Sequence, residues 1–136
     1  IPFFNARQVL ASQMQIVSFK NGAGVRLITQ YDNGIVAINK NELFYHFQGL
    51  TSDGKHYIIA VLPAPADFLP FDSTQHTIDS PTALDFPPFY NPDASEADLK
   101  AYFKAVNEKL DSLTPQDFRP SLSALDELIH SISINP

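Results

Sequence analysis

The fold is decided by LFYHFQGLTSDGKHYIIAVL, residues 43–62. Two runs rich in aromatic and β-branched residues flank a short polar segment that ends in glycine. This pattern predicts a β-hairpin with a three-residue loop, Ser52–Gly54, in which Gly54 adopts the left-handed conformation. Such a loop pairs Thr51 with Lys55 and thereby sets the register of the whole hairpin.

The predicted register assigns the two faces of the hairpin, because successive side chains of a strand point to opposite sides. The face expected to join the core carries only large side chains: Leu43, Tyr45, Phe47, Tyr57, Ile59 and Val61. The other face carries His46, Gln48 and His56 among apolar residues. We expect this second face to be half-covered or to line a groove.

Further elements are predicted on both sides of the hairpin. Alternation over residues 14–19 and 25–31, with a glycine-containing turn between them, predicts two antiparallel strands. Apolar residues at helical spacing from Leu99 to Leu113 predict a helix that Ser95 caps. A last helix is predicted to begin near Leu122 and to end near Ser133.

Seven of the eleven prolines lie between Pro63 and Pro92, where neither a helix nor a central strand can persist. The same segment is rich in aromatic residues, which favours a long connection that packs on the sheet. We therefore predict a single α+β domain. It combines an antiparallel sheet of four to six strands at residues 6–63, a Pro-rich acidic loop at 64–92, and two helices at 93–136 that cover one face.

Composition excludes several classes of function. The chain has 136 residues, 44% of them hydrophobic, and a formal net charge of −6, which disfavours binding to a nucleic-acid backbone. No apolar run approaches the roughly 20 residues of a transmembrane segment. With no cysteine, the chain has no disulfide, thiol catalysis or Cys-ligated metal. The start at Ile1 suits removal of a leader, with export and membrane tethering through residues upstream, and equally suits a chain trimmed to its folded part. We expect the exported, cell-envelope location, with a cytoplasmic location as the alternative.

Histidine is the first candidate for chemistry. The four histidines are His46, His56, His76 and His130. None has the spacing of a metal-binding motif, so no metal or other cofactor is predicted. His130 follows Asp126 by four residues, a pair that suits a general base and equally suits a solvated helix face.

Charge and aromatic content distinguish the Pro-rich loop at 64–92 and the residues next to it. Residues 56–99 contain seven acidic residues and no Lys or Arg, which suits calcium, a basic partner, or merely solubility and helix capping. Its aromatic residues suit either contact with a ligand or core packing. The candidate binding residues are therefore His46, Gln48, His56, Asp67, Phe68, Phe71, Asp72, Phe89 and Tyr90.

Residues 21–31 and 42–63 together resemble uncharacterised exported or lipoprotein-type domains of bacteria, notably cyanobacteria and Chloroflexi. The resemblance implies a cell-envelope setting and no catalytic residues. The hairpin at 45–61 and the ending at 125–132 are also similar to the PsbP/Mog1-like α+β sandwich, in which a late hairpin precedes a closing helix. That similarity implies architecture alone.

These observations predict a non-catalytic binding or accessory module of the bacterial cell envelope, such as the soluble body of a lipoprotein. Its partner is a protein or a small ligand. One alternative is a small hydrolase that uses a histidine and an acidic residue, with His130 or His56 as the base. Another is an inhibitor or immunity-type protein whose acidic loop binds a basic partner.

Overall fold

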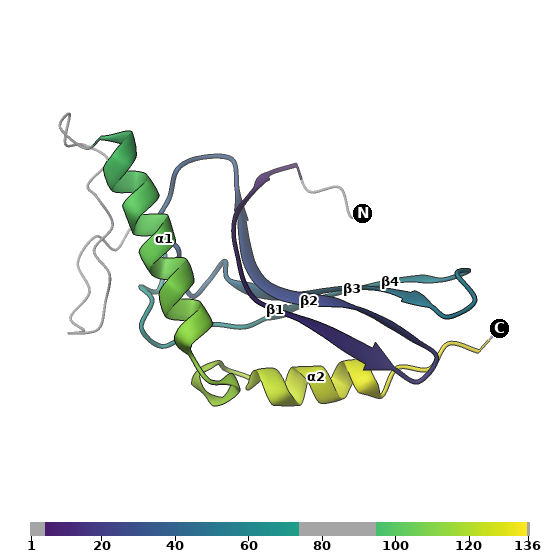
Figure 1. Ribbon diagram of the computed structural model, residues 1–136. Coiled ribbons are helices and arrows are strands. Elements are labelled where there is room, and N and C mark those ends of the chain that lie inside the picture. Colours follow the sequence, from purple (N-terminus) through teal and green to yellow (C-terminus); the bar gives the residue numbers. More distant parts are fainter. Residues whose placement is uncertain (1–4, 74–94, 136) are drawn as a thin grey trace.

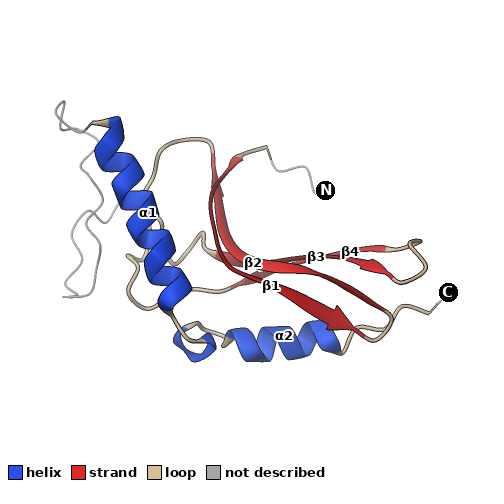
Figure 2. Cartoon of the chain, viewed as in Figure 1, coloured by secondary structure: helices blue, strands red, loops and turns tan. Residues whose placement is uncertain are grey.

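The computed structural model describes residues 5–73 and 95–135, which form an α+β fold (Figures 1 and 2). Within these residues the sheet has four strands, all antiparallel and in the order β1-β2-β3-β4. The elements are β1 (Arg7–Phe19), β2 (Gly22–Asp32), β3 (Phe44–Thr51), β4 (Tyr57–Pro63), α1 (Glu96–Ser112), a 3-10 turn (Pro115–Asp117) and α2 (Leu122–His130). The predicted fold class is confirmed, with the sheet at the lower end of its predicted strand number.

The sheet is bent, and both helices lie on the outer side of the bend (Figure 1). The start of β1 and the end of β2 rise from the rest of the sheet, and α1 packs behind this raised part. Helix α2 lies beneath the flatter part, and both helices make their most extensive contacts with β1. No helix or strand of the described residues covers the inner side of the bend.

The bend coincides with an irregularity in β1. The pairing of β1 with β2 shifts register twice, and between Ser12 and Gln15 it passes through Gln13, whose φ is 53°. A bulge of this kind bends a strand and increases its twist. Gln13 also anchors the end of α1, because its side-chain Nε2 donates to the carbonyls of Leu110 at 2.8 Å and Leu113 at 3.0 Å.

The core lies between the sheet and the two helices. From the sheet, Ile28, Tyr45 and Phe47 are fully buried. The buried helix residues face them: Tyr102, Val106, Leu110, Leu122, Leu125 and Ile129. The stripe predicted for α1 is thereby confirmed, whereas the stripe predicted for α2 is wrong at Leu128, which is exposed.

The predicted register of the hairpin is wrong by one residue. Thr51 pairs with His56 rather than Lys55, so the loop has four residues. The side chains explain the extra residue: the Thr51 hydroxyl accepts the His56 N–H and donates to the Asp53 carboxylate, which also accepts the Lys55 N–H. These bonds lower the pKa of Asp53, and Gly54 has the predicted positive φ of 71°.

The one-residue shift exchanges the two faces of β4. Ile58, Ala60 and Leu62 face the helix side and pack partly buried against the core. The residues that the sequence placed in the core, Tyr57, Ile59 and Val61, lie on the open side with 46%, 43% and 49% of their surface exposed. A slip of one residue exchanges the two faces of a strand completely.

The helix ends depend on local and distant contacts. The predicted cap of α1 is confirmed, since Ser95 and Asp98 form a reciprocal capping box. Helix α2 ends at His130, three residues before the predicted Ser133. The difference arises because the following chain pairs with the β1–β2 turn, where the Lys20 N–H donates to the Ile132 carbonyl at 3.1 Å.

The described part of the Pro-rich loop, residues 64–73, contributes to the core and bonds to the connection before β3 and to the chain before α2, where the Lys40 N–H donates to the Pro70 carbonyl and the Arg119 N–H to the Pro65 carbonyl. Ala64, Ala66, Phe68 and Leu69 are buried, and Ala66 forms an isolated β-bridge with Phe118. Residues 74–92 of the predicted loop lie outside the described residues. The connection at residues 33–43 forms no strand, and the Asn39 side chain holds it by donating to Glu42 at 2.6 Å.

Candidate functional site

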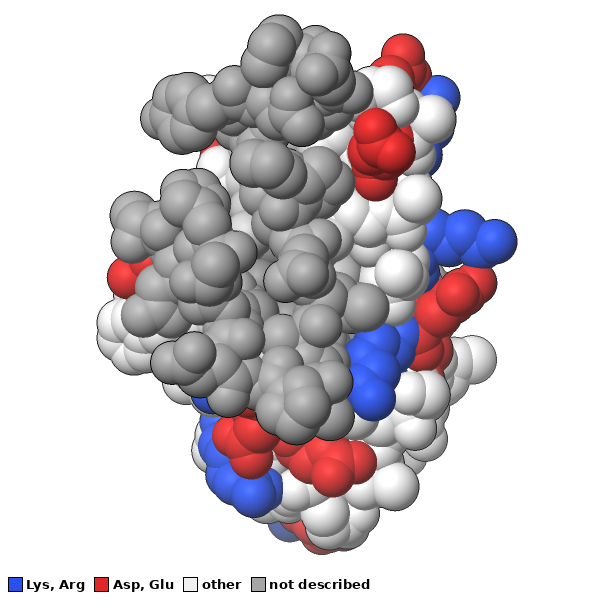
Figure 3. All heavy atoms as spheres, turned by 90° about the vertical axis from the view of Figure 1, so that its left-hand side faces the viewer, with Lys and Arg blue, Asp and Glu red and all other residues white. Residues whose placement is uncertain are grey.

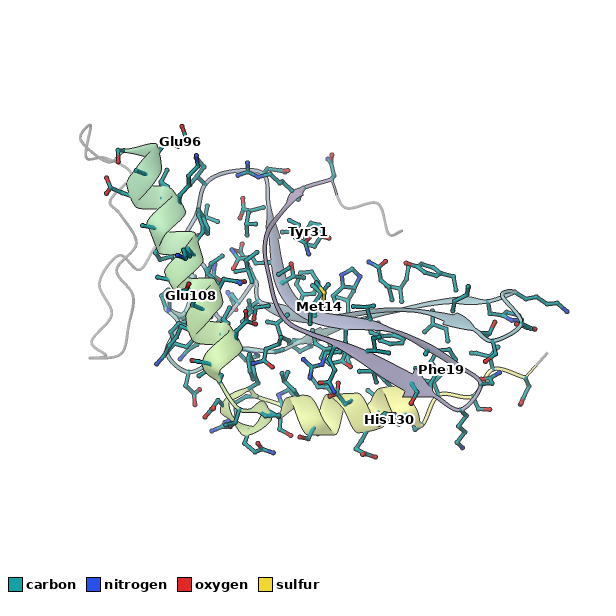
Figure 4. All side chains as sticks on the ribbon, viewed as in Figure 1. Met14, Phe19, Tyr31, Glu96, Glu108 and His130 are labelled. Atoms are coloured by element: carbon teal, nitrogen blue, oxygen red, sulfur yellow. The ribbon has the colours of Figure 1, made fainter. Side chains whose placement is uncertain are left out.

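The open face of the sheet carries most of the exposed large hydrophobic residues in the described part of the chain. Pairing across the sheet aligns Ile16, Val25, Gln48 and Ile59 in one row through all four strands. Met14 also projects on this side, away from α2 (Figure 4). Seven of the ten exposed large hydrophobic residues lie here: Met14, Ile16, Val25, Leu50, Tyr57, Ile59 and Val61. Patches of this kind mark interaction sites more often than chance exposure does.

A shallow hollow of about 370 Å³ lies on this face above β2 and β3. It is lined by Ala23, Gly24, Val25, Leu27, His46, Gln48, Gly49, Leu50 and Tyr57. Gly24 and Gly49 face each other across the two strands, and a Cβ on Gly24 would lie 2.1 Å from the Gln48 carbonyl oxygen. The backbones at this point approach too closely for any larger residue.

The polar groups of the hollow form a hydrogen-bonded row. The Tyr57 hydroxyl donates to Gln48 Oε1 at 2.5 Å, and Gln48 Nε2 lies 3.1 Å from His46 Nε2. The Gln48 amide therefore joins the Tyr57 hydroxyl to the His46 ring. Burial lowers the pKa of His46 and so favours the neutral imidazole.

Aromatic rings continue the open face toward the bend. Tyr31 stacks on Phe44 with 5.9 Å between ring centroids, and Phe44 lies 5.9 Å from the His46 ring. The Tyr31 ring projects into the inner side of the bend (Figure 4). The face is thus apolar and aromatic along its length, with the polar row near its centre.

The structure brings together two of the three predicted hairpin residues. His46 and Gln48 share the hollow, whereas His56 lies in the exposed loop and is not on their face. Tyr57 takes the place predicted for His56, because the register is shifted by one residue. The hydroxyl of Thr51 beside Asp53 was the sequence signal for the longer loop, since such side chains compete for backbone N–H groups.

The predicted loop residues do not form a second site with the hollow. Phe68 is buried in the core and Asp67 pairs with Arg119 at 3.5 Å on the surface. Phe71 is exposed and Asp72 is half-buried, and neither lines the hollow. Phe89 and Tyr90 lie outside the described residues.

The acidic segment gives no assembled cation site in residues 5–73 and 95–135, where no three His, Asp or Glu side chains cluster as a metal would need. Asp98 caps α1, and its hydrogen bonds with Ser95 lower its pKa. Glu96 pairs with Lys100. The remaining acidic residues considered for calcium, Asp79, Asp85 and Asp93, lie outside the described residues.

The histidine and acid proposed for a hydrolase are directed to different partners. Asp126 accepts from the Tyr45 hydroxyl at 2.8 Å and from Arg26 Nε at 3.2 Å. His130 Nδ1 lies 2.6 Å from the Ser18 carbonyl and therefore donates to it. Both interactions attach α2 to the sheet. Burial and the Asp126 hydrogen bond raise the pKa of the Tyr45 hydroxyl well above its usual value.

The outer surface around α1 shows basic and acidic side chains next to one another rather than in separate patches (Figure 3). Glu96–Lys100 and Lys104–Glu108 are such neighbours along α1.

Among the described residues, no helix combines the length and apolarity required to cross a membrane. Comparisons with protein families, curated proteins and solved structures find no match.

Proposed function

We propose that this chain is a non-catalytic binding module that holds an apolar group of its ligand on the open face of the sheet. The observation that carries the proposal is the concentration of exposed apolar side chains on one face, around a hollow with few polar groups. Ligand sites typically combine an apolar lining with a small number of oriented hydrogen-bonding groups. The row of Tyr57, Gln48 and His46 supplies such groups here.

The arrangement favours binding over the predicted hydrolase. The candidate acid, Asp126, is held by a buried arginine and a tyrosine on the helix side of the sheet, whereas the hollow lies on the other side. A general base must lie within hydrogen-bonding reach of the proton that it removes. The predicted cell-envelope setting, with tethering through residues upstream of Ile1, is retained as part of this proposal.

The proposal is tested by mapping where an apolar probe binds. The probe is 1-anilinonaphthalene-8-sulfonate, whose aromatic rings suit the apolar lining of the hollow. In a ¹⁵N–¹H spectrum we expect the probe to shift the amides of Val25, Gln48 and Tyr57. We expect Val25→Glu to weaken binding by about tenfold or more, because it places a carboxylate in the apolar lining.

The matched control is Leu128→Glu, which changes an exposed apolar residue on α2, outside the hollow, in the same way. It is expected to leave probe affinity unchanged. Shifts distributed equally over Ile35, Phe71 and Leu128, or equal weakening by both substitutions, would show that the open face is not a preferred site.

A further inference from the structure

The outer edge of β4 presents unpaired main-chain groups. Within the hairpin, the Thr51 N–H donates to the His56 carbonyl at 3.0 Å and the Ala64 N–H to the Leu43 carbonyl at 3.4 Å. In an antiparallel ladder, residues that bond to a neighbouring strand alternate with residues that point away from it. The even-numbered residues of β4 therefore bond to β3, and the odd-numbered residues point outward.

The outward residues are Tyr57, Ile59 and Val61. Each presents one N–H donor and one C=O acceptor, and within residues 5–73 and 95–135 no hydrogen-bond partner is found for these main-chain groups. Both helices pack chiefly on β1, at the opposite edge of the sheet, so they leave this edge uncovered.

Edge strands of soluble proteins are usually protected by charged residues, bulges, prolines or covering segments. β4 has no charged residue, and its pairing with β3 is regular over its whole length. Its one proline, Pro63, is the last residue of the strand. The edge therefore retains the features that favour pairing with another strand.

We propose that two copies of this chain associate through antiparallel pairing of their β4 edges, with Ile59 opposite Ile59 of the second copy. The outward groups are equally spaced about Ile59, since Tyr57 precedes it and Val61 follows it by two residues. A two-fold axis at Ile59 places Tyr57 opposite Val61 in both directions. The two four-stranded sheets become one continuous sheet.

This pairing uses every outward main-chain N–H and C=O of residues 57–61. Three N–H donors and three C=O acceptors on each copy meet the same set on the other, which forms a ladder without an unpaired group inside it. Pro63 has no N–H and lies just beyond the paired residues, where the ladder ends.

The side chains match as well as the main chain. Tyr57, Ile59 and Val61 are exposed by nearly half and lie on the open face. Pairing brings tyrosine against valine and isoleucine against isoleucine, combinations of aromatic and β-branched residues that stabilise neighbouring strands. The open face then continues from one copy into the other without a charged residue at the junction.

A second copy is favoured over a strand of a different protein because its own β4 supplies an unpaired edge of the same length, with the same uncharged apolar residues. The inference rests on the edge of β4 and does not require the proposed ligand function, because a dimer can form whether or not the hollow binds a ligand.

The first test measures the mass of the complete chain by sedimentation velocity over about a hundredfold range of concentration. We expect the wild-type protein to approach twice the mass of one chain as concentration rises. Ile59→Lys is expected to remain monomeric, because two ammonium groups would meet at the two-fold axis. The matched control, Ile16→Lys, adds the same charge to the same face on the opposite edge strand and is expected to dimerise normally.

The second measurement is amide hydrogen exchange by NMR at high and low concentration, which also reports that each variant is folded. In the wild-type dimer the amides of Tyr57, Ile59 and Val61 should be protected, and dilution should remove that protection. Ile58, Ala60 and Leu62 should stay protected at both concentrations, because they bond to β3.

A monomeric wild-type protein over the whole range would overturn the proposal. If Ile59→Lys still forms dimers, the chains associate through another surface. The same conclusion follows if Ile16→Lys loses its dimers as completely as Ile59→Lys does. Protection of the three outward amides only on addition of an extended apolar peptide would replace the second copy by a different strand.

Discussion

The helix-covered face of the sheet and its open face both present rows of large apolar side chains, but only the first is closed by α1 and α2. On the covered face, Tyr45 and Phe47 are fully buried. On the open face, 76% of the surface of Ile16 is exposed to solvent. Apolar residues of one type therefore stabilise the fold on one side and form a surface for association on the other, according to what covers them.

The two faces also hold different polar networks. On the covered face, Arg26 is almost completely buried and pairs with Asp126, which the Tyr45 hydroxyl also contacts. On the open face, Tyr57, Gln48 and His46 form their row at the edge of a hollow. A buried ion pair is costly to break, because the remaining charge loses its partner, whereas solvent replaces an exposed hydrogen bond such as that between Tyr57 and Gln48.

The largest effect is expected from truncating one apolar residue on each face. Phe47→Ala should lower the free energy of unfolding by about 3 to 5 kcal/mol, because it leaves a cavity in the core. Ile16→Ala should change it by no more than about 0.5 kcal/mol, since its side chain is largely in solvent already. Urea unfolding followed by circular dichroism measures both. Similar losses for the two variants would contradict the assignment of covered and open faces.

Breaking the polar network of the covered face should lower the free energy of unfolding more than breaking the polar row of the open face. Asp126→Ala is expected to lower the free energy of unfolding by about 3 kcal/mol, because it leaves buried Arg26 without its carboxylate. Gln48→Ala on the open face should cost less than about 1 kcal/mol. The same unfolding assay applies. If Gln48→Ala proves the more damaging substitution, the open-face row contributes to the fold rather than to a binding surface.

The smallest effect concerns His46 and pH. Burial places the pKa of His46 in the folded protein below its ordinary value of 6.5, so the unfolded chain binds the proton more readily. Neutral His46 therefore contributes to the free energy of unfolding above pH 6.5, and this contribution is lost as pH falls through the pKa of His46 in the folded protein. We expect wild-type stability to decline more than that of His46→Gln between pH 7.5 and 5. An NMR titration of the His46 ring with a midpoint at or above 6.5 would contradict this prediction.

Local patterns predicted much of the fold. The helical stripe of α1 and the capping box of Ser95 and Asp98 depend on neighbours within a few residues, and both were found where the sequence placed them. The positive φ of Gly54 is local in the same sense. Part of the candidate site followed from the alternation of β3, which places His46 and Gln48 on one face whatever the loop length.

The remainder of the site depended on one hydrogen-bonded loop. Whether Lys55 belongs to the loop or to β4 was decided by the contacts of Thr51 and Asp53, and that single residue determined which side of β4 is exposed. Tyr57 therefore entered the site in place of His56. Alternation within β4 is equally consistent with either register, because both of its faces are largely apolar.

By itself, the sequence determined the approximate positions of both helices and of most strand segments and where α1 begins, because these features follow from short-range periodicity and capping. The alternation predicted the first strand only from residue 14, whereas β1 begins at Arg7. The tertiary structure decided the bend at Gln13, the burial of Arg26 beneath α2 and the exposure of Tyr57, Ile59 and Val61. Gln13 and Leu110 are 97 residues apart in the sequence, and Arg26 and Asp126 are 100 residues apart. Contacts at such separation depend on how the complete chain packs, so no local pattern encodes them.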